Sequence, residues 1–186
     1  MFDLSPTSPQ LDKLDADLCE ARTLLGDAAA AADSPLRVGV SIITGHSSVS
    51  NFEATTLPIL AKHRPAAVWL FAPAEDTDPN PHGAIIAAVR QELDGVRIFV
   101  QVGNVAAARE AARDGADVLV CQGVDAGGHQ FTRGAGVVSL VPEVRAMLAA
   151  AAEEEDEEFR GRGVAVLAAG GIADEKGVAA ALALGK

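Results

Sequence analysis

Apolar runs and helix-like segments alternate along most of the chain. Each run is rich in Val, Ile, Leu and Ala and is apolar at nearly every position, which is typical of strands covered on both faces in a parallel sheet. The predicted strands are LRVGVSIIT (36–44), PAAVWLFAP (65–73), VRIFVQVG (96–103), ADVLVCQG (116–123) and GVAVLAAGG (163–171). The alternation predicts an α/β fold with about five βα units.

Segments with helical spacing precede, separate and follow these strands. The first helix is expected from about Gln10 to Ala32, ahead of any strand. The other helices are expected at 52–63, 84–93, 105–114, 139–159 and 173–185. Asn104 is a good N-cap and Gly115 a good end for one of them. Pro142 is expected near the start of another, because proline is tolerated in the first helical turn.

Two segments share one plan, which helps to choose between architectures. Both VQVGNVAAAREAARDGADVLV and VLAAGGIADEKGVAAALALGK contain a strand, a glycine at its end, an alanine-rich helix and a closing glycine. In the second copy the chain stops where the next strand is due. An open doubly wound sheet and a (β/α)₈ barrel both fit five strands, and a complete barrel takes roughly 250 residues. The repeat favours the barrel.

We therefore expect an incomplete (β/α)₈ fold of the TIM-barrel type, either a fragment or a truncated gene product. In this interpretation residues 1–35 form an N-terminal helical segment and residues 36–186 form a partial barrel domain. Strand edges left open by an incomplete barrel are expected to promote self-association or to recruit a partner.

Composition narrows the possible partners and compartments. The chain has 186 residues, is 49% hydrophobic and carries a formal net charge of −11. An acidic chain is a poor match for nucleic acids and anionic membranes, and no run is long and apolar enough to span a bilayer. The two cysteines, Cys19 and Cys121, are far apart and lack metal-ligand spacing. They predict a reduced, cytoplasmic protein and no metal site.

The chemistry is expected at the C-terminal ends of the strands, where parallel α/β folds bind their ligands. The residues found there are Thr44-Gly45-His46, Gln101-Val102-Gly103, Gln122 with Gly127-Gly128-His129, and Ala169-Gly170-Gly171. In AAGGIAD the glycine pair exposes backbone N–H groups just before a helix, which favours a phosphate. A tight βα turn with no ligand is the competing interpretation of the same glycines.

The stretch CQGVDAGGHQ carries the most specific candidates. His129 follows a glycine pair, and an imidazole with an ordinary pKa near 6.5 suits proton abstraction at neutral pH. A solvent-exposed loop histidine is the alternative. The Gln122 amide suits the edge of a heterocycle, or else caps the strand end. Asp125 is placed either to orient His129 or to cap the loop.

The other histidines and Cys121 are weaker candidates. His46 follows a predicted strand and is a less favoured residue of the same face, whereas His63 and His82 are expected on the surface. Cys121 lies inside an apolar strand with no basic neighbour, and is therefore expected to be a core residue rather than a nucleophile.

Three segments carry a family resemblance. QVGNVAAAREAARDGADVLVCQGVDAGGH, GAGVVSLVPEV and VLAAGGIADEKGVAAALALG resemble the nitronate monooxygenases, formerly 2-nitropropane dioxygenases, which are FMN-dependent TIM barrels. The resemblance is strong from about Val96 to Gly185 and looser from Val38 to Pro73. The strand that opens the family's barrel, and the strand and loop that close it, have no counterpart in this sequence.

The resemblance implies roles for individual residues. The catalytic base falls on His129, and Asp125 stands where the family usually has glutamate. The implied cofactor-binding residues are Gln101 and Gln122 near the isoalloxazine, Gly127 and Gly128 in the loop, and Gly170 and Gly171 at the FMN phosphate. The implied reaction oxidises nitronates or nitroalkanes with O₂ to carbonyl compounds and nitrite. An enoyl-ACP reductase-like FMN barrel and a truncated, non-catalytic paralogue are the alternatives.

Overall fold

The computed structural model describes residues 9–26, 34–45, 49, 51–73, 80–153 and 163–185. The chain divides into two compact units, Met1–Arg97 and Ile98–Lys186. Five strands are described, each followed by a helix, and the strand pairs with a described register are parallel. The predicted α/β fold with five βα units is therefore confirmed. Among the described helices, none is both long and apolar enough to cross a bilayer.

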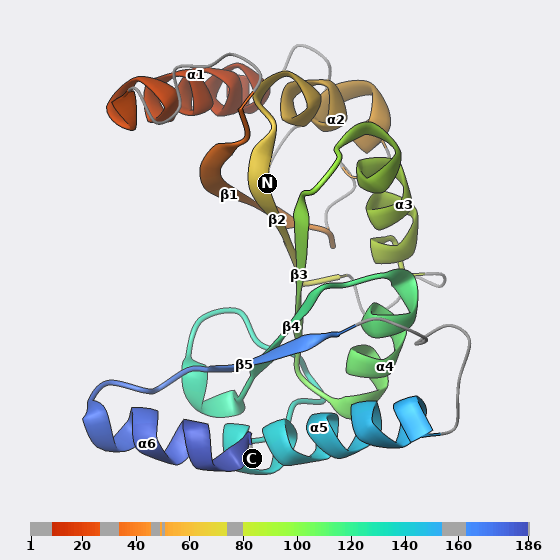
Figure 1. The fold of residues 1–186 in the computed structure, drawn as a ribbon, viewed down its shortest axis with the longest axis vertical. Helices are drawn as coiled ribbons and strands as arrows, with labels where there is room; N and C mark the ends of the chain where they lie inside the picture. Colours follow the sequence, from red (N-terminus) through yellow and green to blue (C-terminus); the bar gives the residue numbers. More distant parts are fainter. Residues whose placement is uncertain are drawn as a thin grey trace. The chain divides into compact units, whose positions relative to one another are not determined.

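Among its described residues, the first unit holds two parallel strands and three α-helices (Figure 1). In chain order these are α1 (Pro9–Leu24), β1 (Leu36–Ile43), α2 (Phe52–His63), β2 (Pro65–Phe71) and α3 (His82–Glu92). Val40 pairs with Val68 and Ile42 with Leu70 across β1 and β2. Helix α2 contacts both α1 and α3. The arrangement brings residues of α1 next to the end of α2, although a strand separates them in the chain.

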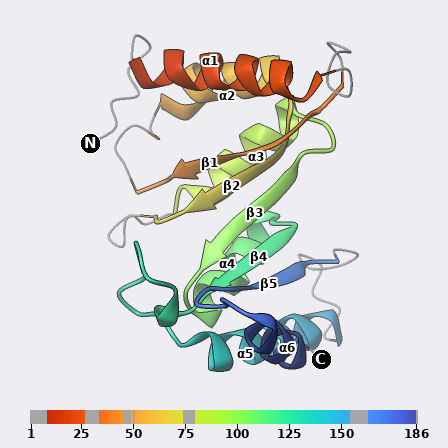
Figure 2. The same cartoon turned by 90° about the vertical axis from the view of Figure 1, so that its left-hand side faces the viewer.

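The second unit contains most of β3 (Arg97–Val102) and everything after it (Figure 2). Its further elements are α4 (Val105–Asp114), β4 (Val118–Gln122), the short 3₁₀ helix η3 (Val124–Ala126), α5 (Val137–Glu153), β5 (Ala165–Ala169) and α6 (Glu175–Leu184). Strand β4 pairs with β3 on one side and with β5 on the other. Helix α5 contacts β4 and β5, and α4 and α6 contact α5.

Burial along the strands follows their place in each unit. β4 is buried at its three central positions, as its continuous apolar pattern predicts. β1 instead exposes Arg37, Gly39 and Ser41, and β5 leaves Leu167 44% exposed. Cover on both faces is therefore confirmed for β4 and wrong for β1 and β5.

Capping residues and prolines in the sequence predicted some helix ends correctly and others wrongly. Asn104 caps α4 by accepting a hydrogen bond from the Ala107 N–H at 2.9 Å, and Gly115 ends it with φ +108. The first helix ends at Leu24, before the predicted Ala32, and residues 27–33 lie outside the described residues. Helix α5 begins before Pro142, which lies inside it.

Two histidines expected on the surface are buried. His82 is 2% exposed at the start of α3, and its Nε2 lies 2.7 Å from the Thr44 hydroxyl at the end of β1. Burial lowers the pKa of His82 to about 4. His63, at the end of α2, is 4% exposed and contacts Asp15 of α1. Both expectations are wrong because a polar partner distant in sequence makes burial of each ring tolerable.

Candidate active site

The candidate site lies in the second unit, where β3, β4 and β5 end. Parallel register brings Gln101 opposite Val120 and Gln122 opposite Ala169, so the polar ends of the strands become neighbours. Gln101 Nε2 donates a hydrogen bond of 2.8 Å to Gln122 Oε1. Both side chains are half-buried. Two candidates that are 21 residues apart in the chain therefore form one amide pair.

Gln122 also connects this amide pair to the candidate base. Its Nε2 donates a hydrogen bond of 2.9 Å to the backbone oxygen of His129. A primary amide has two N–H groups and one carbonyl oxygen, so Gln122 keeps one N–H and Gln101 keeps its oxygen and one N–H. None of these three groups has a further partner among the described residues. They are the groups available to a bound ring.

The loop from Gly123 to Gly136 leaves open space around two of its glycines. Gly127 and Gly128 have φ near +72 and +71, and a Cβ added at either position would meet no atom within 4 Å. Positive φ favours glycine, and the missing side chains allow a ligand to approach the backbone closely. His129 follows with an exposed ring. A ligand can therefore reach the backbone next to His129.

Asp125 caps a helix and does not contact His129. Its Oδ2 accepts a hydrogen bond of 3.2 Å from the N–H of Val137, the first residue of α5. This bond resolves the alternative that the sequence left open. It also explains why α5 begins before Pro142, since Asp125 stabilises the helix from its first N–H group. Gly123 allows the close approach, because a Cβ there would lie 2.5 Å from the Val137 nitrogen.

The glycines after β5 lie against the same loop. In Figure 1 the segment after β4 lies beside the end of β5, where the Gly123 N–H donates to the Ala169 oxygen at 2.7 Å. A Cβ on Gly170 would lie 3.4 Å from the Ala126 Cβ, and one on Gly171 would lie 3.3 Å from the Asp125 oxygen. Gly171 has φ +70. The two loops therefore form one surface.

The helix that follows these glycines is already capped. Asp174 Oδ1 accepts a hydrogen bond of 2.8 Å from the Gly177 N–H, and Glu175 lies in the first turn. Two carboxylates at this helix end oppose an anion there, contrary to the simple helix-dipole argument. The N–H groups of Gly170 and Gly171 have no hydrogen-bond partner in the described part of the chain. They are the better donors for a phosphate.

Sequence reasoning missed the residues that hold the loop against the end of β3 and those that bond it to itself. The Phe131 ring packs over Gly103, where an added Cβ would lie 2.4 Å from the ring. The Ala135 N–H donates to the Gly103 oxygen at 3.0 Å, and Gln130 Nε2 donates to the Val124 oxygen at 2.8 Å. The available signal was one aromatic residue, Phe131, within a polar, glycine-rich loop.

Of the two remaining candidates, the structure describes only Cys121. Cys121 is fully buried, and burial raises its pKa to about 12, so its predicted core role is confirmed. His46 lies outside the described residues.

Comparisons with known proteins indicate the family of this chain. Residues 58–186 match the family described as nitronate monooxygenase. A nitronate monooxygenase of Neurospora crassa is 46% identical over 98% of this chain and 48% of its own length. One of Metarhizium robertsii is 38% identical, with the same coverage of both chains. The chain thus spans about half the length of these curated relatives.

Solved structures agree on the fold. FabK from Thermotoga maritima has a TM-score of 0.65 at 25% identity, with 94% of this chain and 44% of that chain covered. Nitroalkane oxidase from Streptomyces ansochromogenes has a TM-score of 0.63 at 22% identity, with 94% and 52% covered. The expected TIM-barrel type of α/β fold is confirmed. With its sequence matches and its five βα units taken together, the chain belongs to the nitronate monooxygenase family.

Proposed function

We propose that this chain carries the flavin-facing and substrate-facing part of an FMN-dependent enzyme that oxidises nitronates or nitroalkanes with O₂, giving carbonyl compounds and nitrite. The family membership supports the reaction class. The observation that carries the proposal is the hydrogen-bonded chain from Gln101 through Gln122 to the backbone of His129, beside open glycines. It supports the proposal because the amide groups and the open glycines belong to the same strand end and loop as the exposed His129 ring.

The residues present fit FMN. The free groups of Gln101 and Gln122 suit the polar edge of the isoalloxazine, which offers both donors and acceptors. Gly127 and Gly128 leave the space that side chains would fill. The N–H groups of Gly170 and Gly171 suit the phosphate. Bound FMN would supply electron acceptance and reaction with O₂, while the protein supplies binding and orientation.

His129 is proposed to remove the α-proton of a nitroalkane. Its ring is exposed and follows two glycines, so a small substrate has access to either ring nitrogen. Gln122 holds the His129 backbone oxygen and thereby limits where the ring can swing. A nitronate has already lost this proton, so its oxidation should not need the base.

The proposal also covers domain organisation, self-association and cellular location. We propose that residues 36–186 act as the partial FMN-binding barrel domain and that residues 1–35 form its N-terminal helical segment, whose helix α1 contacts α2. Self-association through β5 and α6 is proposed because Leu167 is 44% and Leu182 67% exposed. Cytoplasmic location is proposed because Cys19 and Cys121 are both free.

One alternative has an observation in its favour. The structural likeness to FabK at 25% identity suits a flavin-dependent enoyl reductase. The curated relatives named nitronate monooxygenase match at higher identity and over more of the chain, and we favour that reaction. The two reactions differ in their substrates. One oxidises a nitronate with O₂, whereas the other reduces an enone with a nicotinamide.

The test starts from the purified 186-residue chain with added FMN. Binding is measured by the absorption band and by fluorescence quenching of the flavin. Oxygen uptake with propionate 3-nitronate is then compared with enone reduction by a nicotinamide. The proposal predicts FMN binding and oxygen uptake. A folded chain that ignores FMN would instead support the non-catalytic paralogue, and enone reduction alone would support the reductase.

Two variants distinguish the effect of losing the His129 ring from the effect of disturbing the loop that carries it. His129→Ala should keep FMN and nitronate turnover but lose turnover of the neutral nitroalkane. Gln130→Ala is the matched control, because it removes the loop bond to the Val124 oxygen and leaves the base in place. Unchanged nitroalkane turnover in His129→Ala would remove His129 from the mechanism.

A further inference from the structure

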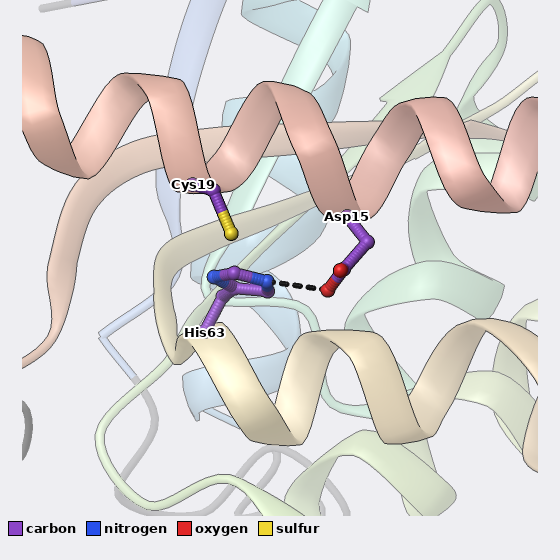
Figure 3. Close-up of side chains that lie close together, drawn as sticks. All are labelled: Asp15, Cys19 and His63. Atoms are coloured by element: carbon purple, nitrogen blue, oxygen red, sulfur yellow. Dashed lines mark hydrogen bonds and ion pairs between the residues drawn. The ribbon is translucent and has the colours of Figure 1, made fainter.

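A second cluster of reactive side chains lies in the first unit and shares no residue with the candidate active site. Figure 3 shows Asp15 and Cys19 projecting from α1 toward His63 at the end of α2. One ligand atom from each residue lies within 4.8 Å of the other two. Asp15 and Cys19 are four residues apart on one helix face, so both face α2.

The donor set is typical of a zinc-type ion. Thiolate, imidazole and carboxylate are the three ligand classes that zinc accepts in proteins. We propose that Asp15, Cys19 and His63 bind a divalent cation of the zinc class, with the fourth position left to water or another ligand. A three-ligand site with one open position is the arrangement of catalytic rather than structural zinc sites.

The spacing needs only side-chain adjustment. Bond lengths of about 2.0–2.3 Å in a tetrahedral site put the ligand atoms roughly 3.3–3.6 Å apart. His63 Nε2 now lies 2.7 Å from Asp15 Oδ1, and the longest separation in the cluster is within 4.8 Å. The histidine and the aspartate must move slightly apart and the thiol must swing inward. Both changes are rotations about side-chain bonds of α1 and α2.

The surroundings hold one ligand firmly and leave an entry path. His63 is buried, and Arg22 Nη2 donates a hydrogen bond of 2.8 Å to its backbone oxygen, which ties the end of α2 to α1. Cys19 is exposed and Asp15 is half-buried. A cation can therefore arrive from solvent at the thiol and meet an imidazole that is already oriented.

Lys62 makes the proposal sharply testable. Its Nζ lies 2.7 and 2.9 Å from the two oxygens of Asp15, so the ammonium holds the carboxylate that a metal would need. A bound cation must displace or repel Lys62. Removing this lysine should therefore tighten metal binding while it weakens the ion pair.

Sequence spacing could not reveal this cluster, because His63 is 48 residues from Asp15. A role limited to joining α1 and α2 by ion pairs is the competing explanation. In that case Lys62 is only an ion-pair partner of Asp15, and the cluster binds no metal ion through Cys19. The two explanations are therefore separated by Co²⁺ binding and by whether Lys62→Gln strengthens it.

The experiment titrates the metal-free 186-residue chain with Co²⁺, a coloured probe for zinc sites, and then displaces it with Zn²⁺. We expect a thiolate-to-cobalt band that disappears in Cys19→Ser and persists in Cys121→Ser, the matched control at the other cysteine. Asp15→Asn and His63→Gln should weaken Co²⁺ binding by at least about tenfold. Lys62→Gln should strengthen it. Binding should weaken as pH falls, because the ligands must lose their protons.

A second measurement needs no substitution. Zn²⁺ should slow the alkylation of Cys19 in the unmodified chain by at least about tenfold, since a coordinated thiolate is a poor nucleophile. Absence of the cobalt band, its persistence in Cys19→Ser, or weaker binding in Lys62→Gln would each overturn the proposal. So would an alkylation rate that Zn²⁺ does not change.

Discussion

Acidification should destabilise the first unit through His82. Its ring is 2% exposed, and the described contact of Nε2 is the Thr44 hydroxyl at 2.7 Å, a neutral group. A protonated imidazole in this place would lose its hydration without gaining a charged partner among the described residues. Burial accordingly lowers the pKa of His82 from 6.5 to about 4.

The direction and the magnitude of this loss of stability follow from the linkage between proton binding and folding. Because the folded pKa is the lower one, the unfolded chain binds the extra proton between pH 6.5 and about pH 4. The contribution to stability is therefore complete above pH 6.5 and is lost as the pH falls toward 4. A difference of about 2.5 pH units corresponds to about 3 kcal/mol, of which about 2.5 kcal/mol is lost by pH 4.5.

The assay is urea unfolding at pH 7.5 and pH 4.5, followed by fluorescence. The chain has one tryptophan, Trp69, which lies on β2 in the same unit as His82. His82→Gln is the reference, because the amide can still bond to the Thr44 hydroxyl but does not titrate. The original chain should lose about 2.5 kcal/mol more than the variant between the two pH values. Equal losses, or an NMR titration of His82 near pH 6.5, would refute the reasoning.

Three further predictions concern the second unit. Gly123→Ala should cost about 1–3 kcal/mol in urea unfolding, because the new Cβ lies 2.5 Å from the Val137 nitrogen; Gly163→Ala, with no atom within 4 Å, should cost less than about 0.5 kcal/mol. Asn104→Ala should cost about 1 kcal/mol through loss of the α4 cap, and an unchanged unfolding midpoint would contradict this. Gln122→Leu should weaken FMN binding measured by fluorescence quenching, whereas unchanged binding would remove the amide pair from the proposed cofactor site.

Much of the fold was predictable because its signals are local. The apolar runs fixed where strands form, and Asn104 and Gly115 marked both ends of α4 by their own backbone preferences. The start of α5 was not predictable in this way, since it depends on the Asp125 carboxylate, which lies 12 residues before Val137. A cap supplied from a preceding loop leaves no signal next to the helix.

The candidate site likewise combines features that the sequence predicts with features that depend on residues far apart in the chain. Gln101 and Gln122 could be placed together because parallel strands in register bring their ends side by side. The buried environments of His63 and His82 could not be predicted, because their partners are 48 and 38 residues away. Sequence alone identifies which side chains are reactive, but burial and partners arise only when distant segments pack.

The hydrogen-bonded chain that ends at the His129 backbone couples the proposed cofactor site to the loop of the proposed base. Gln122 accepts from Gln101 and donates to the His129 oxygen, so one side chain both faces the proposed flavin and holds this loop. Loss of the Gln122 amide should therefore loosen the loop and weaken flavin binding together. Turnover alone would not separate these two effects in Gln122→Leu, whereas flavin binding and loop mobility measured side by side would.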